Sequence, residues 1–145
     1  MPAINPWKSY RRIATQTAPP GQLVLMLFDG VLSSLDRALI GFGYTEIGER
    51  NVAIHNNIQH AVDILRELNG SLDLDAGGQL ATTLRGLYAY FERRLIESNR
   101  KKSRHGIDEV LPMVKQLRDA WFQMINGGTP SIVVPLSWSG NQFAE

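Results

Sequence analysis

The chain of 145 residues contains no cysteine. It can therefore form neither disulfides nor thiolate metal sites, and it has no thiol nucleophile. Long apolar runs are missing as well. The N-terminus has no stretch of signal-peptide length, and no window approaches the ~18 uncharged apolar residues of a membrane-spanning helix. We expect a cytosolic protein that does not insert into a membrane.

The sequence also lacks an excess of charge of either sign. It has 15 basic and 14 acidic residues, for a formal net charge of +1. This balance gives no long-range field that would attract nucleic acid. Basic residues gather only in NRKKSRH, residues 99–105, without interleaved aromatic side chains. We interpret this segment as a solvated helix end, with a nucleic-acid regulator as the minor alternative.

Catalytic and metal-binding motifs are absent too. There is no G-x-S-x-G, Walker A or dinucleotide-binding glycine pattern. Asp73 and Asp75 begin a segment like a calcium loop, but Leu84 stands where that loop needs a bidentate glutamate. His55 and His60 lie about 140° apart around a helix, with no carboxylate pair to complete a site. We expect no enzyme, no metal and no cofactor.

Helical periodicity is what the sequence does contain. Four amphipathic segments, at residues 21–40, 47–69, 77–99 and 107–125, are separated by short polar or glycine-containing links. Pro112 should either start the last helix or kink it. The pattern predicts an all-α, antiparallel four-helix bundle over residues 21–126. Residues 1–20 are expected to form a mobile N-terminal segment, and residues 127–145 an extended or disordered tail.

Two of the predicted helices carry more apolar surface than one core face requires. Residues 23–28 are apolar around the whole circumference of the first helix. In the third, Tyr90 and Ile96 flank a core stripe on opposite sides. The surplus favours either a binding site for a partner helix or a broad core in a self-associating bundle. Residues expected in that core stripe are Leu80, Leu84, Leu87, Tyr88, Phe91 and Leu95, and the second helix should start its own stripe at Ile47.

Three blocks of the chain, in order, resemble the FliS family of flagellin-specific export chaperones. They are Tyr10 with TAPPGQLVLMLFDGVL, then HNNIQHAVDILRELNGSLDLDAGGQLATTLRGLYAYFERRLIESN, and finally IDEVLPMVKQLRDAWFQM. The resemblance implies a cofactor-free bundle that binds the disordered C-terminal segment of flagellin in a 1:1 cytoplasmic complex. It further implies that the bundle prevents premature polymerisation and delivers flagellin to a membrane protein of the export gate. The alternative is a self-associating structural or adaptor bundle, such as a weak homodimer.

The resemblance also implies partner-binding residues. In similar proteins the N-terminal segment covers a groove until flagellin displaces it, and Tyr10 would anchor such a lid here. Pro19 stands where the family usually has serine, which removes an N-cap of about 1 kcal/mol and is expected to loosen the start of the first helix. Leu27 and Tyr88 are expected to belong mostly to the core. The complete set is Tyr10, Met26, Leu27, Gly30, Asn56, Asn57, Tyr88, Tyr90, Arg93, Arg94 and Ile96.

Overall fold

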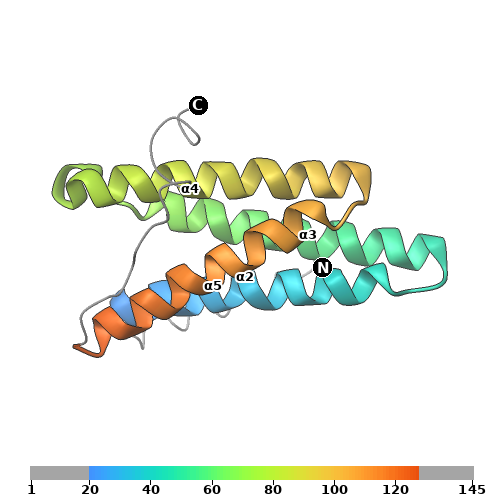
Figure 1. The fold of residues 1–145 in the computed structure, drawn as a ribbon, viewed down its shortest axis with the longest axis horizontal. Coiled ribbons are helices and arrows are strands. Elements are labelled where there is room, and N and C mark those ends of the chain that lie inside the picture. Colours follow the sequence, from blue (N-terminus) through green and yellow to red (C-terminus); the bar gives the residue numbers. More distant parts are fainter. Residues whose placement is uncertain (1–19, 128–145) are drawn as a thin grey trace, which may run out of the picture.

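The structure is a computed structural model that describes residues 20–127. This part of the chain forms four helices and no strand: α2 (Pro20–Phe42), α3 (Ile47–Gly70), α4 (Leu74–Lys101) and α5 (His105–Ile125). Successive helices run in opposite directions, and α5 returns along both α4 and α2 (Figure 1). The predicted antiparallel four-helix bundle is confirmed. The predicted N-terminal lid and C-terminal tail lie outside the described residues, apart from Pro20 and Gly127 at their borders.

The helices α2 and α3 fit closely in a single register. Three residues with small side chains on α2 each face a residue of α3: Gly30 faces Ile64, Ser34 faces His60, and Gly41 faces Ala53. The number of residues between successive contacts on α2 equals the number between their partners on α3, counted in the opposite direction, as expected for one straight antiparallel pairing. A Cβ atom on Gly30 would lie 3.0 Å from Ile64 Cδ1. Gly30 therefore allows close helix packing, whatever else it contributes.

The helices α4 and α5 meet at another glycine. Gly106 is buried in the first turn of α5, and its N–H donates to Ser98 Oγ on α4 at 2.8 Å. A Cβ atom on Gly106 would overlap the carbonyl oxygen of Arg94 and the hydroxyl of Ser98. The start of α5 thus rests directly on the backbone of α4, which only glycine permits.

The start of α4 differs from the sequence expectation. The helix begins at Leu74, within the segment that the sequence predicts to be a connection. Asp73 caps it, because its Oδ1 accepts hydrogen bonds from the N–H groups of Asp75 and Ala76 at 3.1 and 3.0 Å. Gly78 then interrupts the helix with φ of +55° and ψ of −134°. Residues 74–77 are consequently a separate capped turn, set at an angle to the main helix.

Pro112 neither starts α5 nor ends it. The helix begins seven residues earlier, at His105, and continues through Pro112 to Ile125. Of the two expected alternatives, a helix start near Pro112 is therefore ruled out. Pro112 is exposed, so the carbonyl group that loses its helical hydrogen-bond donor lies on the solvent side of α5.

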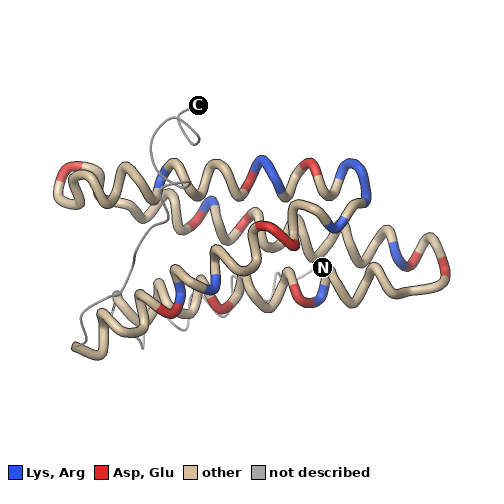
Figure 2. Tube along the Cα trace, in the orientation of Figure 1, with Lys and Arg blue, Asp and Glu red and all other residues tan. Residues whose placement is uncertain are grey.

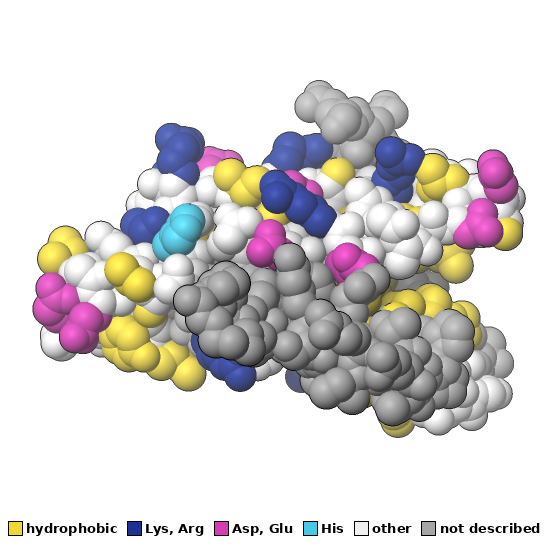
Figure 3. Space-filling model, turned by 180° about the vertical axis from the view of Figure 1, so that it is seen from behind, with side chains coloured by type: hydrophobic (Ala, Val, Ile, Leu, Met, Phe, Trp, Pro, Cys, Tyr) yellow, Lys and Arg dark blue, Asp and Glu magenta, His cyan; other side chains and the backbone are white. Residues whose placement is uncertain are grey.

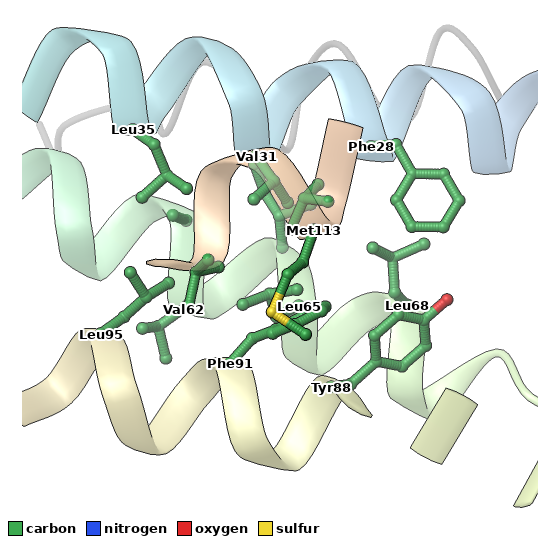
Figure 4. Close-up of a cluster of buried hydrophobic side chains, with 14 of the residues drawn as sticks. Phe28, Val31, Leu35, Val62, Leu65, Leu68, Tyr88, Phe91, Leu95 and Met113 are labelled. Carbon is green, nitrogen blue, oxygen red and sulfur yellow. The ribbon is translucent and has the colours of Figure 1, made fainter. Parts of the chain in front are cut away.

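The core receives side chains from all four helices, and Figure 4 shows ten of them by name. Five of the six residues in the predicted stripe of α4 are buried, which confirms the periodicity there. Leu80 was expected in the core and is 50% exposed, because it follows the break at Gly78 near the end of the bundle. Ile47 was also expected in the core and is 62% exposed. Ile47 lies on the predicted core face of α3. It is nevertheless exposed, because the first turns of α3 extend beyond the end of α4.

A histidine between α2 and α3 predicts a pH dependence of stability. Burial lowers the pKa of His60, Arg37 lowers it further, and Asp63 opposes both. The unfolded chain therefore binds this proton more tightly than the folded chain, so the histidine destabilises the fold as pH falls below its unfolded pKa of about 6.5. We expect the free energy of unfolding to decrease between about pH 7 and pH 5, and to decrease less in His60→Gln.

Urea denaturation at several pH values measures this effect. The exposed His105→Gln variant serves as the control and should keep the pH dependence of the unmodified chain. Equal slopes of stability against pH for the His60→Gln variant and the unmodified chain would contradict the assignment.

Candidate binding cleft

A cleft of about 330 Å³ opens at the end of the bundle where α3 passes into α4. All four helices contribute to it, and its lining is mainly apolar, with Ser71 and Asp73 as the polar exceptions. The apolar lining residues with large side chains are Val24 from α2, Leu68 from α3, Leu72 from the connection, Leu80, Leu84 and Tyr88 from α4, and Trp121 from α5.

Tyr88 forms the floor of this cleft. It is 3% exposed, its ring centroid lies 6.4 Å from that of Phe28, and Leu68 lies beside both rings (Figure 4). Burial raises the pKa of Tyr88, so the phenol is neutral at physiological pH and its hydroxyl remains a donor. Within residues 20–127 this hydroxyl makes no hydrogen bond. The floor thus offers one polar atom among apolar surroundings.

Trp121 fixes the wall between α5 and α2. Its Nε1–H donates to the carbonyl oxygen of Gly21 at 2.9 Å, and its ring centroid lies 6.5 Å from that of Phe28. A Cβ atom on Gly21 would approach Ile125 Cγ2 to 2.9 Å, so the first turn of α2 lies tightly against the end of α5. These contacts hold the start of α2, which the sequence predicts to be loose.

The lip of the cleft exposes apolar side chains. Leu80 is half exposed just after the break at Gly78, and Leu74 is 39% exposed in the capped turn before it. Ala76 and Gly77 of the same turn line the opening. Apolar side chains around an apolar hollow are the usual mark of a binding surface.

Tyr90 and Arg94, which the sequence places on the flanks of a groove, connect α4 to α5 instead of lining this cleft. The Tyr90 hydroxyl and Arg94 Nε both donate to Glu109 Oε1, at 2.9 and 2.7 Å. Arg94 also donates to Glu97 at 3.2 Å. Burial raises the pKa of Tyr90, and the hydrogen bond with Glu109 raises it further. The guanidinium of Arg93 lies 5.9 Å from the Tyr90 ring centroid.

The other predicted site residues are spread over the bundle. Leu27 is buried in the core, Met26 is half-buried on α2, and Tyr10 lies outside the described residues. The side-chain amide of Asn57 donates to the carbonyl oxygen of Ala53 in its own helix at 2.8 Å. Asn56 and Ile96 are exposed. Of the predicted residues that lie within residues 20–127, only Tyr88 lines the cleft.

Sequence reasoning did not identify Leu72, Leu80 and Trp121 as cleft residues. A signal was present in SLDLDAGG, residues 71–78, where Asp73 can cap a helical turn and a glycine pair can break one. That combination would have placed Leu80 just after a break in the helix, at the end of the bundle, rather than in the core. The contribution of Trp121 depends on which helix ends lie together, and no local pattern shows this.

Residues 20–127 contain neither a cluster of metal ligands nor a membrane-spanning helix. No three or more His, Asp or Glu side chains in this range are grouped so as to hold a metal ion. None of the four helices is long and apolar enough to cross a membrane. The cleft itself is mainly apolar, with the Tyr88 hydroxyl on its floor.

Fold and cleft together define an all-α bundle with an open apolar site at one end. The family model described as "Flagellar protein FliS" matches residues 3–128 of this chain. The flagellar secretion chaperone FliS of Salmonella typhimurium is 35% identical over 122 residues, which cover 81% of this chain and 87% of the relative. The FliS chaperone of Bacillus subtilis is 32% identical over 121 residues, which cover 83% and 86% of the two chains.

The FliS chaperone of Escherichia coli is also 32% identical over 121 residues, which cover 83% of this chain and 85% of the relative. This chain belongs to the FliS family, whose members are flagellar secretion chaperones. The family resemblance seen in the sequence is confirmed, and the role is that of a chaperone rather than of an enzyme.

Proposed function

We propose that this chaperone binds the disordered C-terminal segment of flagellin, one molecule to one, in the bacterial cytoplasm. Binding keeps flagellin from polymerising before export, and the complex then meets a membrane protein of the flagellar export gate. The observation that carries the proposal is the open apolar cleft in a bundle of the FliS family. Neither a cofactor nor a catalytic step is needed.

The chemistry of the cleft suits an amphipathic segment that folds as it binds. Such a segment presents apolar side chains at three- and four-residue spacing, and an apolar hollow between helix ends can accept them. Leu74 and Leu80 would lose their solvent exposure in the complex, at a gain of roughly 25 cal/mol per Å² of apolar surface. Ordering the segment opposes this gain, which keeps the complex reversible.

The hydroxyl of Tyr88 gives the cleft a directional contact. It is neutral and has no hydrogen-bond partner within residues 20–127, while apolar side chains surround it. A backbone carbonyl group of the flagellin segment would satisfy it at a helix end or an irregular turn. This contact would select the position at which the segment enters the cleft.

We also propose that flagellin extends beyond the cleft along the bundle. Met26, Asn56 and Ile96 offer half-buried or exposed side chains for this part of the contact. Tyr90, Arg93 and Arg94 would border this part of the contact, where Glu109 already accepts from the Tyr90 hydroxyl and from Arg94 Nε, and Glu97 accepts from Arg94 Nη1. Tyr10 remains the proposed anchor of an N-terminal lid that flagellin displaces.

Calorimetry of the full chain with a C-terminal flagellin peptide tests the proposed function. A peptide of about forty residues would span about 60 Å as a helix, enough to fill the cleft and continue along the bundle. We expect one-to-one binding with a negative heat-capacity change, because apolar surface is buried. A scrambled peptide of the same composition is the control. Absence of heat together with an unchanged elution volume would refute the proposal.

A further inference from the structure

The predicted tail, which follows α5, contains a regular alternation of side chains. Within residues 131–138 every even position has a large apolar side chain, and the odd positions have serine, proline or a single valine. A period of two residues places the even side chains on one face of an extended segment. Pro135 opposes a helix there and favours extended backbone at the residue before it. The apolar face consists of Ile132, Val134, Leu136 and Trp138.

This apolar face has no sheet to join in the described part of the chain. Residues 20–127 form helices and turns only. An extended segment with one apolar face is normally covered on that face, by a sheet, a helix or a groove. Left in water, four large side chains in a row would forgo the free energy that burial provides. The segment therefore needs an apolar surface, either on this bundle or on another molecule.

The tail leaves the bundle beside the cleft. In Figure 1 the end of α5 and the start of α4 lie at the same end of the molecule. Trp121, which lines the cleft, stands six residues before Gly127, or about 9 Å along a helix. Gly127 has φ of +80°, and a left-handed residue at this position turns the chain away from the helix axis. The five residues from there to Ile132 span up to about 17 Å when extended, enough to return to the cleft.

Apolar side chains surround the route from α5 into the cleft. Nine large hydrophobic residues are exposed within residues 20–127, and four of them lie at this end: Leu74, Leu80, Phe122 and Met124. Figure 3 shows hydrophobic side chains at the end where α4 begins, with acidic ones at its edge. Residues 20–28 and 120–127 contain no charged side chain, and Figure 2 shows these ends of α2 and α5 in tan. The tail would therefore enter the cleft across an uncharged surface.

We propose that residues 131–138 occupy the cleft of their own chain, with their apolar face turned towards its lining. The lengths of the two surfaces agree. The cleft wall on α4 extends from Leu80 to Tyr88, or about 12 Å at 1.5 Å per residue. The first three side chains of the apolar face span about 13 Å at 3.3 Å per residue. Each of them can thus contact the wall, and Trp138 would cover the exposed lip.

Charge favours the tail over the N-terminal segment as the occupant of the cleft. Residues 128–144 contain no charged side chain, and the single charged residue of the cleft lining, Asp73, is exposed. Residues 1–19 lead to the same end of the bundle through α2, but they contain three cations. Their large apolar side chains, Trp7, Tyr10 and Ile13, are three residues apart, which is a helical spacing. The lid proposed at Tyr10 therefore concerns the contact along the bundle.

The docked tail is a weak internal competitor for the cleft. Ordering eight residues costs conformational entropy, which offsets most of the gain from burying the apolar side chains. We expect the docked form to exceed the undocked form about two- to tenfold. A segment that binds the cleft must displace the tail, so its apparent dissociation constant exceeds the intrinsic one by a similar factor. For flagellin this consequence rests on the proposed function, whereas the docking itself does not.

Cysteine reactivity of the full chain tests the docking without flagellin. The chain contains no cysteine, so one introduced thiol reports on one position. Val134→Cys lies on the apolar face of the tail, and Ser137→Cys, the matched control, lies on the opposite face. After each rate is divided by its value in urea, we expect iodoacetamide to modify the thiol at 134 at least about threefold more slowly. Equal normalised rates would overturn the docking.

A charge in the lining identifies the cleft as the place of docking. Leu80→Asp should release the tail, because the docked apolar face would bury the carboxylate, and the thiol at 134 should then lose its protection. Ile40→Asp, at the far end of α2, is the control and should keep the protection. Protection that survives Leu80→Asp would overturn the proposal, since the tail would lie elsewhere. Protection that grows between about 2 and 200 μM protein would also overturn it, since the cleft would belong to a second copy.

Charges in the tail test the competition with flagellin. Val134→Asp with Leu136→Asp puts two carboxylates on the apolar face, and Ser131→Asp with Ser137→Asp puts two on the opposite face. The first variant should bind the C-terminal flagellin peptide at least about threefold more tightly than the unmodified chain, and the second with unchanged affinity. The gain should be similar in size to the protection of the thiol, because both measure the same docking ratio. Equal affinities of the two variants would overturn the competition.

The two experiments separate this inference from the proposed function. If the peptide does not bind the unmodified chain, the proposed function fails, and the thiol rates still decide whether the tail is docked. If the peptide binds and the normalised thiol rates are equal, the docking fails and the proposed function stands.

Discussion

Replacing Gly106 by alanine is expected to lower the free energy of unfolding by about 3 kcal/mol or more. The added methyl group would overlap the backbone oxygen of Arg94, which cannot rotate away as a side chain could. The start of α5 would have to shift, and the hydrogen bond from the Gly106 N–H to the buried Ser98 hydroxyl would be lost. Urea denaturation followed by circular dichroism gives the change directly.

Gly70→Ala provides the matched control for this prediction. Gly70 is the last residue of α3, and a Cβ atom there would meet nothing within 4 Å. The substitution should stabilise the chain by up to about 1 kcal/mol, because alanine restricts the unfolded state more than glycine does. Similar changes in stability for the two variants would show that α4 and α5 are not in close backbone contact at Gly106.

Replacing Leu80 by aspartate is expected to weaken the binding of the C-terminal flagellin peptide at least about 30-fold, or about 2 kcal/mol. Leu80 lines the cleft and is half exposed, so the free protein tolerates a charge there while the occupied cleft would bury it. The free energy of unfolding should change by less than about 1 kcal/mol. Calorimetry measures the affinity, and circular dichroism checks the fold.

Two exposed isoleucines complete this test. Ile40→Asp, at the far end of α2, should leave peptide binding unchanged. Ile96→Asp, on the flank of α4, should have a smaller effect than Leu80→Asp, because Ile96 lies outside the cleft. A larger effect at Ile96 would show that flagellin binds mainly along α4, as the family resemblance implies, and that the cleft is secondary.

The fold of the described residues could be predicted from the sequence because helical periodicity records which side of each segment is buried. Leu87, Phe91 and Leu95 are buried as their spacing requires. Periodicity gives the direction of a side chain but not the position at which a neighbouring helix ends. For that reason Leu80 and Ile47, although both lie on the predicted core face of their helices, are exposed. Each lies near an end of the bundle, where the neighbouring helix does not cover it.

The candidate site was harder to predict, because it depends on contacts between distant segments. Tyr90 and Arg94 looked available for a partner, yet Glu109, on the next helix, binds both. Gly30 and Gly106 gave no sign in the sequence of the backbone approach that each permits. The family resemblance suggested most of the binding residues, and most of those within the described part of the chain lie away from the cleft.

The origin of the cleft walls in four separate helices has a thermodynamic consequence. No pair of helices forms the cleft alone, so a ligand that fills it binds the complete bundle and not partly unfolded forms. Its binding energy then adds to the stability of the whole fold, by about 2.7 kcal/mol at a hundred times the dissociation constant. Conversely, loosening of this one end of the bundle would release the ligand without any competitor. Affinity for cargo and resistance to unfolding are thus linked properties of the same four helix ends.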